Sequence, residues 1–196
     1  RLSNLINASD THDAYRKRYY KQTTDIDLNN IEFSPIGTYS NTLNIYCSFN
    51  GVYDGGNNAI TNLYISQCEA QGGLFALACD ATIKNISVFG EIDTHGEDDY
   101  GGVVGNINNS TVINCAFNGT VSGGGCVGGI IGRIWRSGTV ESCYFNGDLI
   151  AKSINSERHS IGGIAGAMTA GYQEQVQNIT IKNCYAVGNM TASTPY

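Results

Sequence analysis

Residues 128–147 read GGIIGRIWRSGTVESCYFNG, which is a glycine pair, two apolar residues, a small residue and a short apolar segment that ends in glycine. The same pattern occurs at 72–90, 101–119 and 162–188. A unit that returns every roughly 27 to 40 residues is typical of a solenoid, in which each unit buries its apolar face by stacking on its neighbours. The repeat therefore predicts an architecture and says much less about chemistry.

Length and composition narrow the fold class. The 196 residues fit one domain, and 25 glycines, only 2 prolines and many short β-branched runs favour an all-β chain with tight turns. Together with the repeat, this predicts a right-handed parallel β-helix of about six rungs. A net charge of −6 argues against a nucleic-acid partner. No apolar run approaches the roughly 20 residues that cross a bilayer.

Three cysteines share one slot of the repeat with an isoleucine: Ile86, Cys115, Cys143 and Cys184. A slot that accepts either residue is a small apolar core position. Neighbouring rungs lie about 4.8 Å apart, but their parallel Cβ vectors suit a stack of reduced thiols better than a bridge. Outside this slot, a disulfide between Cys68 and Cys79 stays open as an alternative.

Other columns follow from the same alignment. Two are expected to point inward: Val88, Phe117, Phe145 and Ala186 or Val187, then Ile92, Val121, Leu149 and Met190. One is expected to point outward: Lys84, Ile113, Glu141 and Lys182. A polar column is expected at a corner, where amides bond along the stack: Asn62, Asn85, Asn114, Ser142 and Asn183. Loops of varying length are expected at 106–110, 133–138 and 167–177, and at 93–100, 123–126 and 153–160.

The first residues differ from the rest. Leu2, Leu5 and Ile6 lie at helical spacing, and a short helix there would cover the open end of a stack. We therefore divide the chain into a capping segment, 1–24, and a solenoid, 25–196, with Arg16–Arg18 as a solvated face of the cap. Because the sequence opens at Arg1 rather than Met, we expect a fragment of a longer protein.

At these motifs the chain resembles the GLUG-repeat family. The matching stretches are Gly73-Leu74-Phe75-Ala76, Gly102-Val103-Val104-Gly105, Gly129-Ile130-Ile131-Gly132 and Gly163-Ile164-Ala165-Gly166, with family-like lead-in segments at 25–28, 35–37 and 49–55. Ala76 replaces the usual closing glycine, and the last repeat carries an insertion. The resemblance covers residues 25 to about 192 and implies a parallel β-helix in an extracellular setting, as in bacterial adhesin-like proteins and non-catalytic parts of IgA-protease-type metallopeptidases. It implies no catalytic residues and no cofactor.

Few residues suggest chemistry. Three scattered histidines and no zinc-type spacing favour no metal site. The acidic residues at 91–99 favour a solvated loop over a calcium site, since the spacing of a calcium loop is absent. Asp25, Asp27 and Asp54 favour turn capping, with a pair of catalytic carboxylates on adjacent rungs as the alternative.

The stretch Arg133-Ile134-Trp135-Arg136 carries the only tryptophan and is expected in a loop. A tryptophan flanked by arginines could stack on a sugar or anchor a protein partner, with Tyr172 in a second inserted loop as a neighbour. The alternative is that Trp135 only packs over the side of the solenoid.

Three functions follow from these observations. The first is a non-catalytic module of a bacterial cell-surface or secreted protein, tethered to further domains, that acts in adhesion to a host glycan or glycoprotein or as a spacer. The second is an accessory region of an IgA-protease-type metallopeptidase. The third is a carbohydrate-active β-helix that uses carboxylates such as Asp25 and Asp54.

Overall fold

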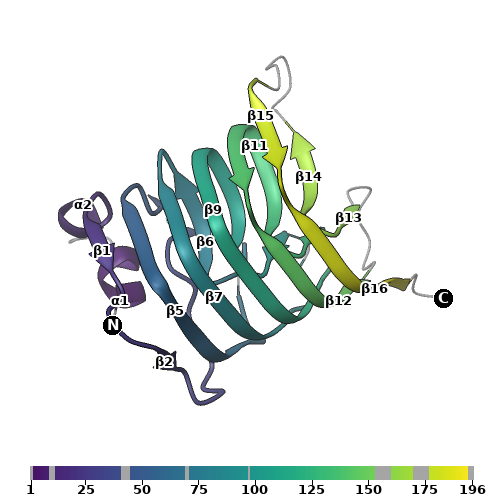
Figure 1. Cartoon of the computed structure of the whole chain (residues 1–196). Coiled ribbons are helices and arrows are strands. Elements are labelled where there is room, and N and C mark those ends of the chain that lie inside the picture. The colour runs from purple at the N-terminus through teal and green to yellow at the C-terminus, as the bar shows by residue number, and fades with distance from the viewer. Residues whose placement is uncertain are drawn as a thin grey trace.

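The computed structural model describes residues 2–8, 12–40, 45–68, 71–96, 98–152, 160–169 and 177–193. Two short helices precede a succession of strands (Figure 1). The elements are α1 (Leu2–Asn7), α2 (His12–Tyr15), β1 (Tyr19–Lys21), β2 (Ile26–Asp27), β3 (Thr38–Ser40), β4 (Ile45–Cys47), β5 (Val52–Ile65), β6 (Phe75–Cys79), β7 (Thr82–Asp93), β8 (Asp99–Gly101), β9 (Val104–Gly123), β10 (Cys126–Gly128), β11 (Ile131–Glu141), β12 (Tyr144–Lys152), β13 (Ser160–Gly162), β14 (Ala165–Thr169), β15 (Ile179–Lys182) and β16 (Tyr185–Ser193).

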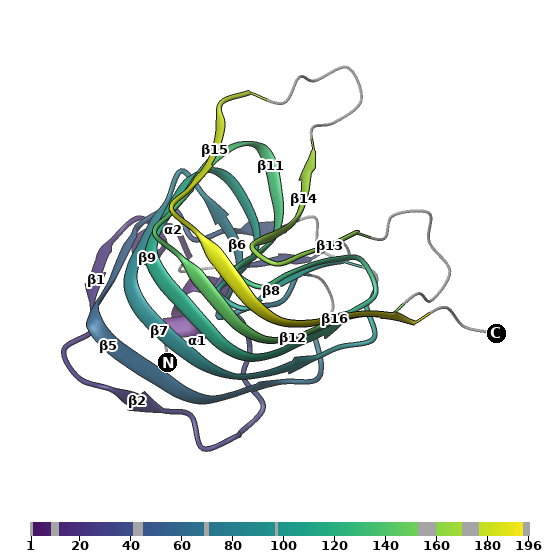
Figure 2. The ribbon, with the colours of Figure 1, turned by 45° about the vertical axis from the view of Figure 1, so that its right-hand side comes forward.

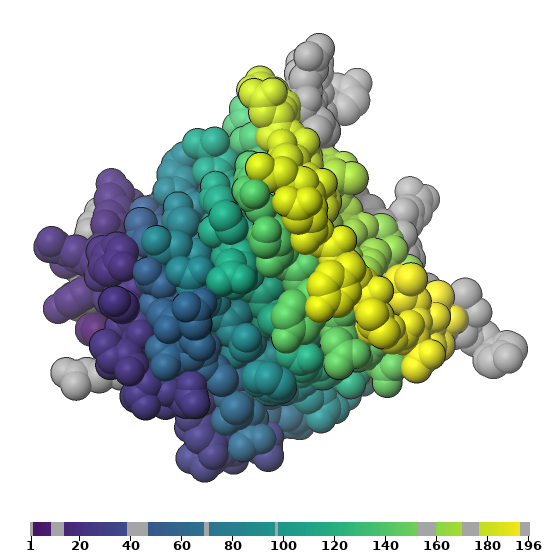
Figure 3. Space-filling view, viewed as in Figure 1, coloured from purple at the N-terminus to yellow at the C-terminus, as the bar shows by residue number. Residues whose placement is uncertain are grey.

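The strands form parallel sheets that run across the repeats. The largest is an 11-stranded sheet that follows the order β1-β5-β7-β9-β11-β14 with β2, β6, β12, β15 and β16 alongside, and a 3-stranded sheet has the order β13-β10-β8. Within the described residues only β3 and β4 pair antiparallel. Figure 2 shows the chain returning repeatedly past the same faces, and Figure 3 shows successive repeats as adjacent bands. The all-β prediction is confirmed, and the parallel sheets fit a β-helix.

The predicted inward columns are in register. Val88 pairs with Phe117, Phe117 with Phe145, and Phe145 with Ala186, so the register makes Ala186 and not Val187 the last member, although Ala186 is itself exposed. The rings of Phe117 and Phe145 stack with their centroids 6.3 Å apart. Burial of such side chains is the main force that holds the repeats together.

The second inward column holds Ile92, Val121 and Leu149, each fully buried. Met190 continues it through its register with Leu149, yet Met190 is 61% exposed. Its strand, β16, pairs on one side only among the described residues. The expected column is therefore present, but its last side chain lies at an open face.

The glycines that end the apolar segment of each repeat also form a column, and they lie inside β7, β9, β12 and β16 rather than at the strand ends that the sequence suggested. Gly90, Gly119, Gly147 and Gly188 are register partners. A Cβ on Gly119 would lie 1.8 Å from the carbonyl oxygen of Gly90, and one on Gly147 would lie 1.8 Å from that of Gly119. Only glycine permits this backbone approach, which explains why glycine recurs at this position of each repeat.

The thiols stack as predicted. Cys115 and Cys143 are each 1% exposed, and the Sγ atom of Cys184 accepts a hydrogen bond from the backbone N–H of Cys143 at 3.4 Å. All seven cysteines are free, so the alternative of a bridge between Cys68 and Cys79 is wrong. Cys68 lies in a buried setting that raises the pKa of its thiol to about 12.

The polar corner column is only partly as predicted. Asn85, Asn114, Ser142 and Asn183 all have φ between 52° and 57°, a left-handed conformation that asparagine tolerates. Asn114 Nδ2 donates to Asn85 Oδ1 at 2.9 Å, which confirms one step of the amide ladder. Asn62 was placed wrongly: β5 shifts its register between Ile60 and Leu63, and Asn62 Nδ2 instead donates to Asp27 Oδ1 at 2.8 Å.

The N-terminal helices lie beside β1 and β5 (Figure 1). Ile6 of α1 is fully buried in the core, and Ser3 Oγ donates to the carbonyl of Ser34 at 2.6 Å. Lys17 and Arg18 are exposed, whereas Arg16 is half-buried. Strand β1 falls within the segment 1–24 and pairs in parallel with β5.

Candidate functional site

The stretch Arg133–Arg136 lies in a strand, not in a loop as the sequence suggested. It belongs to β11, which pairs with β9 on one side and β14 on the other. Residues 106–110, also expected as a loop, lie within β9. The only irregularity is a register shift between Trp135 and Gly138, at which Arg136 is exposed with φ 68°.

Side chains along this part of β11 alternate between inside and outside. Ile134 is fully buried, in register with the fully buried Ile107. Arg133 and Trp135 are on the opposite, outward side and only partly exposed. The structure therefore brings these two predicted site residues together, while Arg136 lies at the bulge and Tyr172 lies outside the described residues.

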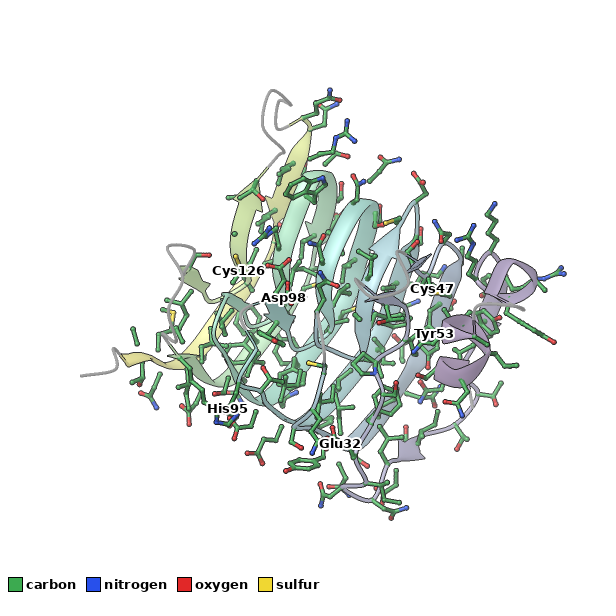
Figure 4. The ribbon with its side chains drawn as sticks, turned by 180° about the vertical axis from the view of Figure 1, so that it is seen from behind. Glu32, Cys47, Tyr53, His95, Asp98 and Cys126 are labelled. Atoms are coloured by element: carbon green, nitrogen blue, oxygen red, sulfur yellow. The ribbon has the colours of Figure 1, made fainter. Side chains whose placement is uncertain are left out.

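The outward positions of three neighbouring strands form a small grid. One row is Leu77, Asn106 and Arg133, and the next is Cys79, Asn108 and Trp135. Gln71, Asp98 and Asp99 form a further wall. Together they line a hollow of about 340 Å³, which we call the Arg133–Trp135 hollow. Figure 4 shows its side of the molecule, with Asp98 and Cys126 labelled.

A buried ion pair fixes one side of the hollow. Arg133 Nη2 lies 2.9 Å from Asp99 Oδ1, and the two side chains are only 15% and 4% exposed. Asn106 Nδ2 donates to Asp99 Oδ2 at 2.8 Å, and Arg133 Nη2 also contacts the Sγ atom of Cys126 at 3.3 Å. Asp99 was expected in a solvated acidic loop, and this expectation was wrong because Arg133 reaches it from another repeat.

The electrostatics of the pair follow from this burial. Burial raises the pKa of the Asp99 carboxyl, although the nearby Arg133 guanidinium and the Asn106 amide oppose the rise. Burial is the largest single influence on the pKa of Arg133 and lowers it, but the negative charge of Asp99 together with Cys126 and Asp98 outweighs it, so the pKa of Arg133 is raised. Three buried polar atoms on the hollow residues lack a hydrogen-bond partner in the described structure: Arg133 Nε, Gln71 Oε1 and Asp99 Oδ1, the last of which takes part in the ion pair with Arg133.

The tryptophan adds an aromatic wall. The Arg133 guanidinium carbon lies 5.9 Å from the centroid of the Trp135 ring, within range of a cation–π interaction. Arg133 thereby joins the ion pair to the indole and holds both in one arrangement. An aromatic surface, amides and a fixed ion pair converge on one small space.

Several residues of the hollow were missed in the sequence. Asn106 and Asn108 looked like loop residues, and Gln71 carried no signal at all. Alternation of Arg133, Ile134 and Trp135 around a buried isoleucine is the pattern of a half-buried strand and would have indicated β11. Asp99 is 34 positions from its partner, so no local pattern pairs them.

The other carboxylates accept backbone N–H groups, as expected, although the partner of Asp25 lies in β5 and not in the turn that holds Asp25. Asp25 Oδ1 accepts the backbone N–H of Ala59 at 2.7 Å, and Asp54 Oδ1 accepts that of Gly56 at 3.0 Å. Hydrogen bonds from the Asn85 amide and the Gly56 backbone lower the pKa of Asp54 to about 2. Asp27 Oδ1 accepts the N–H of Asn29 at 2.8 Å.

No cluster of three or more metal-ligating side chains occurs among the described residues. Within the acidic stretch, Asp93 forms an ion pair with Lys152. In the same part of the chain, no helix has the length and apolarity needed to span a bilayer.

Comparison with known proteins adds two findings. The model of a family described as "The GLUG motif" matches residues 123–150, which hold β10, β11 and most of β12. Halomucin of Haloquadratum walsbyi (strain DSM 16790 / HBSQ001) is 37% identical over 94 residues, which are 47% of this chain and 1% of Halomucin. The chain thus spans a very small part of this relative.

No solved structure matches this chain. The predicted resemblance is confirmed for residues 123–150: the chain contains a GLUG motif, formed by the repeat that carries Arg133 and Trp135.

Proposed function

We propose that the chain is a non-catalytic β-solenoid module of a bacterial cell-surface or secreted protein, which displays a ligand-binding surface or acts as a spacer. In this proposal the solenoid is right-handed, has about six rungs and is capped by α1. The GLUG motif and the similarity to Halomucin support a repeat module of a surface protein.

The observation that carries the proposal is that the repeated positions fill the interior, whereas the outward positions vary. Successive repeats place phenylalanines, thiols and glycines in register and fill the interior with them. Inward columns keep one chemical character, whereas the outward rows change, as from Leu77 to Asn106 to Arg133. Specific chemistry is thus confined to the outside, which suits display of a surface.

The two ends support a module within a longer array. Ile6 and Ser3 of α1 attach the helix to the core, as a cap does. At the other end, inward-column side chains are exposed: Met168, Ile181 and Met190. Further chain of the same kind would bury them, so we propose that the module is tethered to other domains.

The geometry disfavours a carbohydrate-active β-helix. Asp54 accepts hydrogen bonds from a backbone N–H and from Asn85, and Asp25 caps the backbone at Ala59. A low pKa at Asp54 suits a structural acceptor and not a general acid. An accessory region of an IgA-protease-type metallopeptidase stays a second proposal, which a zinc-binding HExxH sequence in the parent protein would favour.

Antibody accessibility tests the proposal. An antibody raised against the purified module is applied to intact cells that make the protein, and to their culture medium. We expect staining of intact cells or recovery from the medium. Staining only after the cells are permeabilised would refute a surface or secreted module.

A further inference from the structure

We propose that the Arg133–Trp135 hollow binds a neutral saccharide, one or two sugar rings of a glycan. The inference deepens the proposed function, since it names the ligand class of the displayed surface. A display module without this site would remain a spacer, so the two proposals can fail separately.

The size of the hollow sets the first limit. Its volume of about 340 Å³ lies at the lower end of the range of about 300–1,000 Å³ for small-molecule sites. Strands about 4.8 Å apart, with outward side chains about 6.8 Å apart along each strand, give a floor about the size of a sugar ring. Such a floor is too small for a protein domain.

The side chains that line the hollow determine which kind of ligand it can bind. The face of an indole carries partial negative charge, so the Trp135 ring attracts the C–H face of a pyranose. Asn108 offers an amide beside it, and Asn106 and Arg133 border the next row. Amides and guanidinium groups are the planar donors and acceptors that hydroxyl groups can bind in pairs. One apolar wall and several polar walls match the two faces of a sugar.

The site is also built before any ligand arrives. Arg133 is held by Asp99, Cys126 and Trp135, so its orientation is already fixed. Burial of this ion pair is costly, and Arg133 Nε and Gln71 Oε1 stay without a hydrogen-bond partner in the described structure. Because the lining is already ordered, little further ordering is needed on binding.

The charge argues for a neutral sugar. The positive charge of Arg133 is already neutralised by Asp99, and Asp98 adds a second carboxylate to the lining. A sialylated or sulfated sugar would therefore gain less from Arg133 than it would from an unpaired guanidinium. Nucleotides and other phosphates are disfavoured for the same reason.

The lone tryptophan makes the test direct, because all tryptophan fluorescence of the chain comes from Trp135. We would titrate the purified module with galactosides, mannosides, glucosides, fucosides and N-acetylhexosaminides, and with sialyllactose and a heparin disaccharide as anionic probes. We expect a saturable change in emission for at least one neutral sugar, with a Kd of about 1 mM or tighter. No change with any neutral sugar at about 50 mM, or an equal or stronger response to the anionic probes, would overturn the proposal.

Variants then locate the site by calorimetry. We expect Asn108→Ala to weaken binding about tenfold and Trp135→Ala to abolish it. The matched control is Phe89→Ala, which removes another partly exposed aromatic ring (40% exposed) from β7. It should bind as the unmodified protein does.

Unchanged affinity in both Asn108→Ala and Trp135→Ala would overturn the assignment, as would a partner protein that binds at Trp135 while no sugar does. Asn108→Ala keeps the test valid if Trp135→Ala fails to fold.

Discussion

Gly119→Ala is expected to destabilise the protein strongly. The new Cβ would lie 1.8 Å from the carbonyl oxygen of Gly90, whereas carbon and oxygen approach to about 3.3 Å. The two strands must therefore separate locally by about 1.5 Å, beyond the reach of ladder hydrogen bonds. Losing about two such bonds costs about 2 kcal/mol, and a non-glycine residue at φ 146° adds about 1–3 kcal/mol.

The expected loss of stability is therefore about 4 kcal/mol, or about 8–16 °C in Tm for a domain of this size. Thermal unfolding followed by circular dichroism would measure it, with urea unfolding for the free energy. The matched control is Asn146→Ala in the neighbouring repeat, whose exposed side chain should leave stability within about 0.5 kcal/mol. A Tm for Gly119→Ala within about 2 °C of the unmodified protein would show that Gly90 does not lie against Gly119.

Three further predictions concern charges and thiols. The folded pKa of Asp54, about 2, lies below its unfolded value near 3.8. Its stabilising effect is therefore complete above about pH 4 and is lost as the pH falls towards 2. Urea unfolding across this range should show that the free energy of unfolding falls less steeply with pH in Asp54→Asn than in the unmodified protein. Arg133→Met should cost about 3–5 kcal/mol in urea unfolding because it leaves Asp99 buried and unpaired. Iodoacetamide should modify Cys184 in the native protein long before Cys115, as mass spectrometry of digests would show.

Each of these has a contrary outcome. If the free energy of unfolding fell equally with pH in Asp54→Asn and in the unmodified protein between pH 4 and 2, Asp54 would have no part in acid unfolding. For the ion pair, the double variant Arg133→Met with Asp99→Leu should be more stable than Arg133→Met alone; a less stable double variant would contradict the pairing. Equal labelling of Cys115 and Cys184 would mean that the thiol column is open to solvent.

The repeat allowed the interior to be predicted well. Phe117, Phe145 and the thiols recur at equivalent positions because every repeat must fill the same internal space. Residues that align between successive repeats in the sequence are therefore expected to contact one another in the structure. Asn62 shows where this prediction fails. A register shift in β5 displaces Asn62 from the expected column, and no residue in the sequence indicates that shift.

The candidate site was harder to predict, since it lies on the outside. Outward positions need not repeat, and the polar residues of 106–110 and 133–138 therefore resembled loops although they lie in β9 and β11. The ion pair between Asp99 and Arg133 joins two repeats and depends on the register of the strands. Trp135 was recognised as a candidate because it is the single tryptophan of the chain and is flanked by arginines.

An anomalous sulfur map from a crystal of the protein would test most directly that equivalent residues of successive repeats stack in a dry interior. The Sγ atoms of Cys115, Cys143 and Cys184 should lie in one row, with neighbours about 4.8 Å apart and apolar side chains around the first two. Sulfur atoms scattered more than about 10 Å apart, or facing solvent at Cys115 and Cys143, would contradict the stacked arrangement.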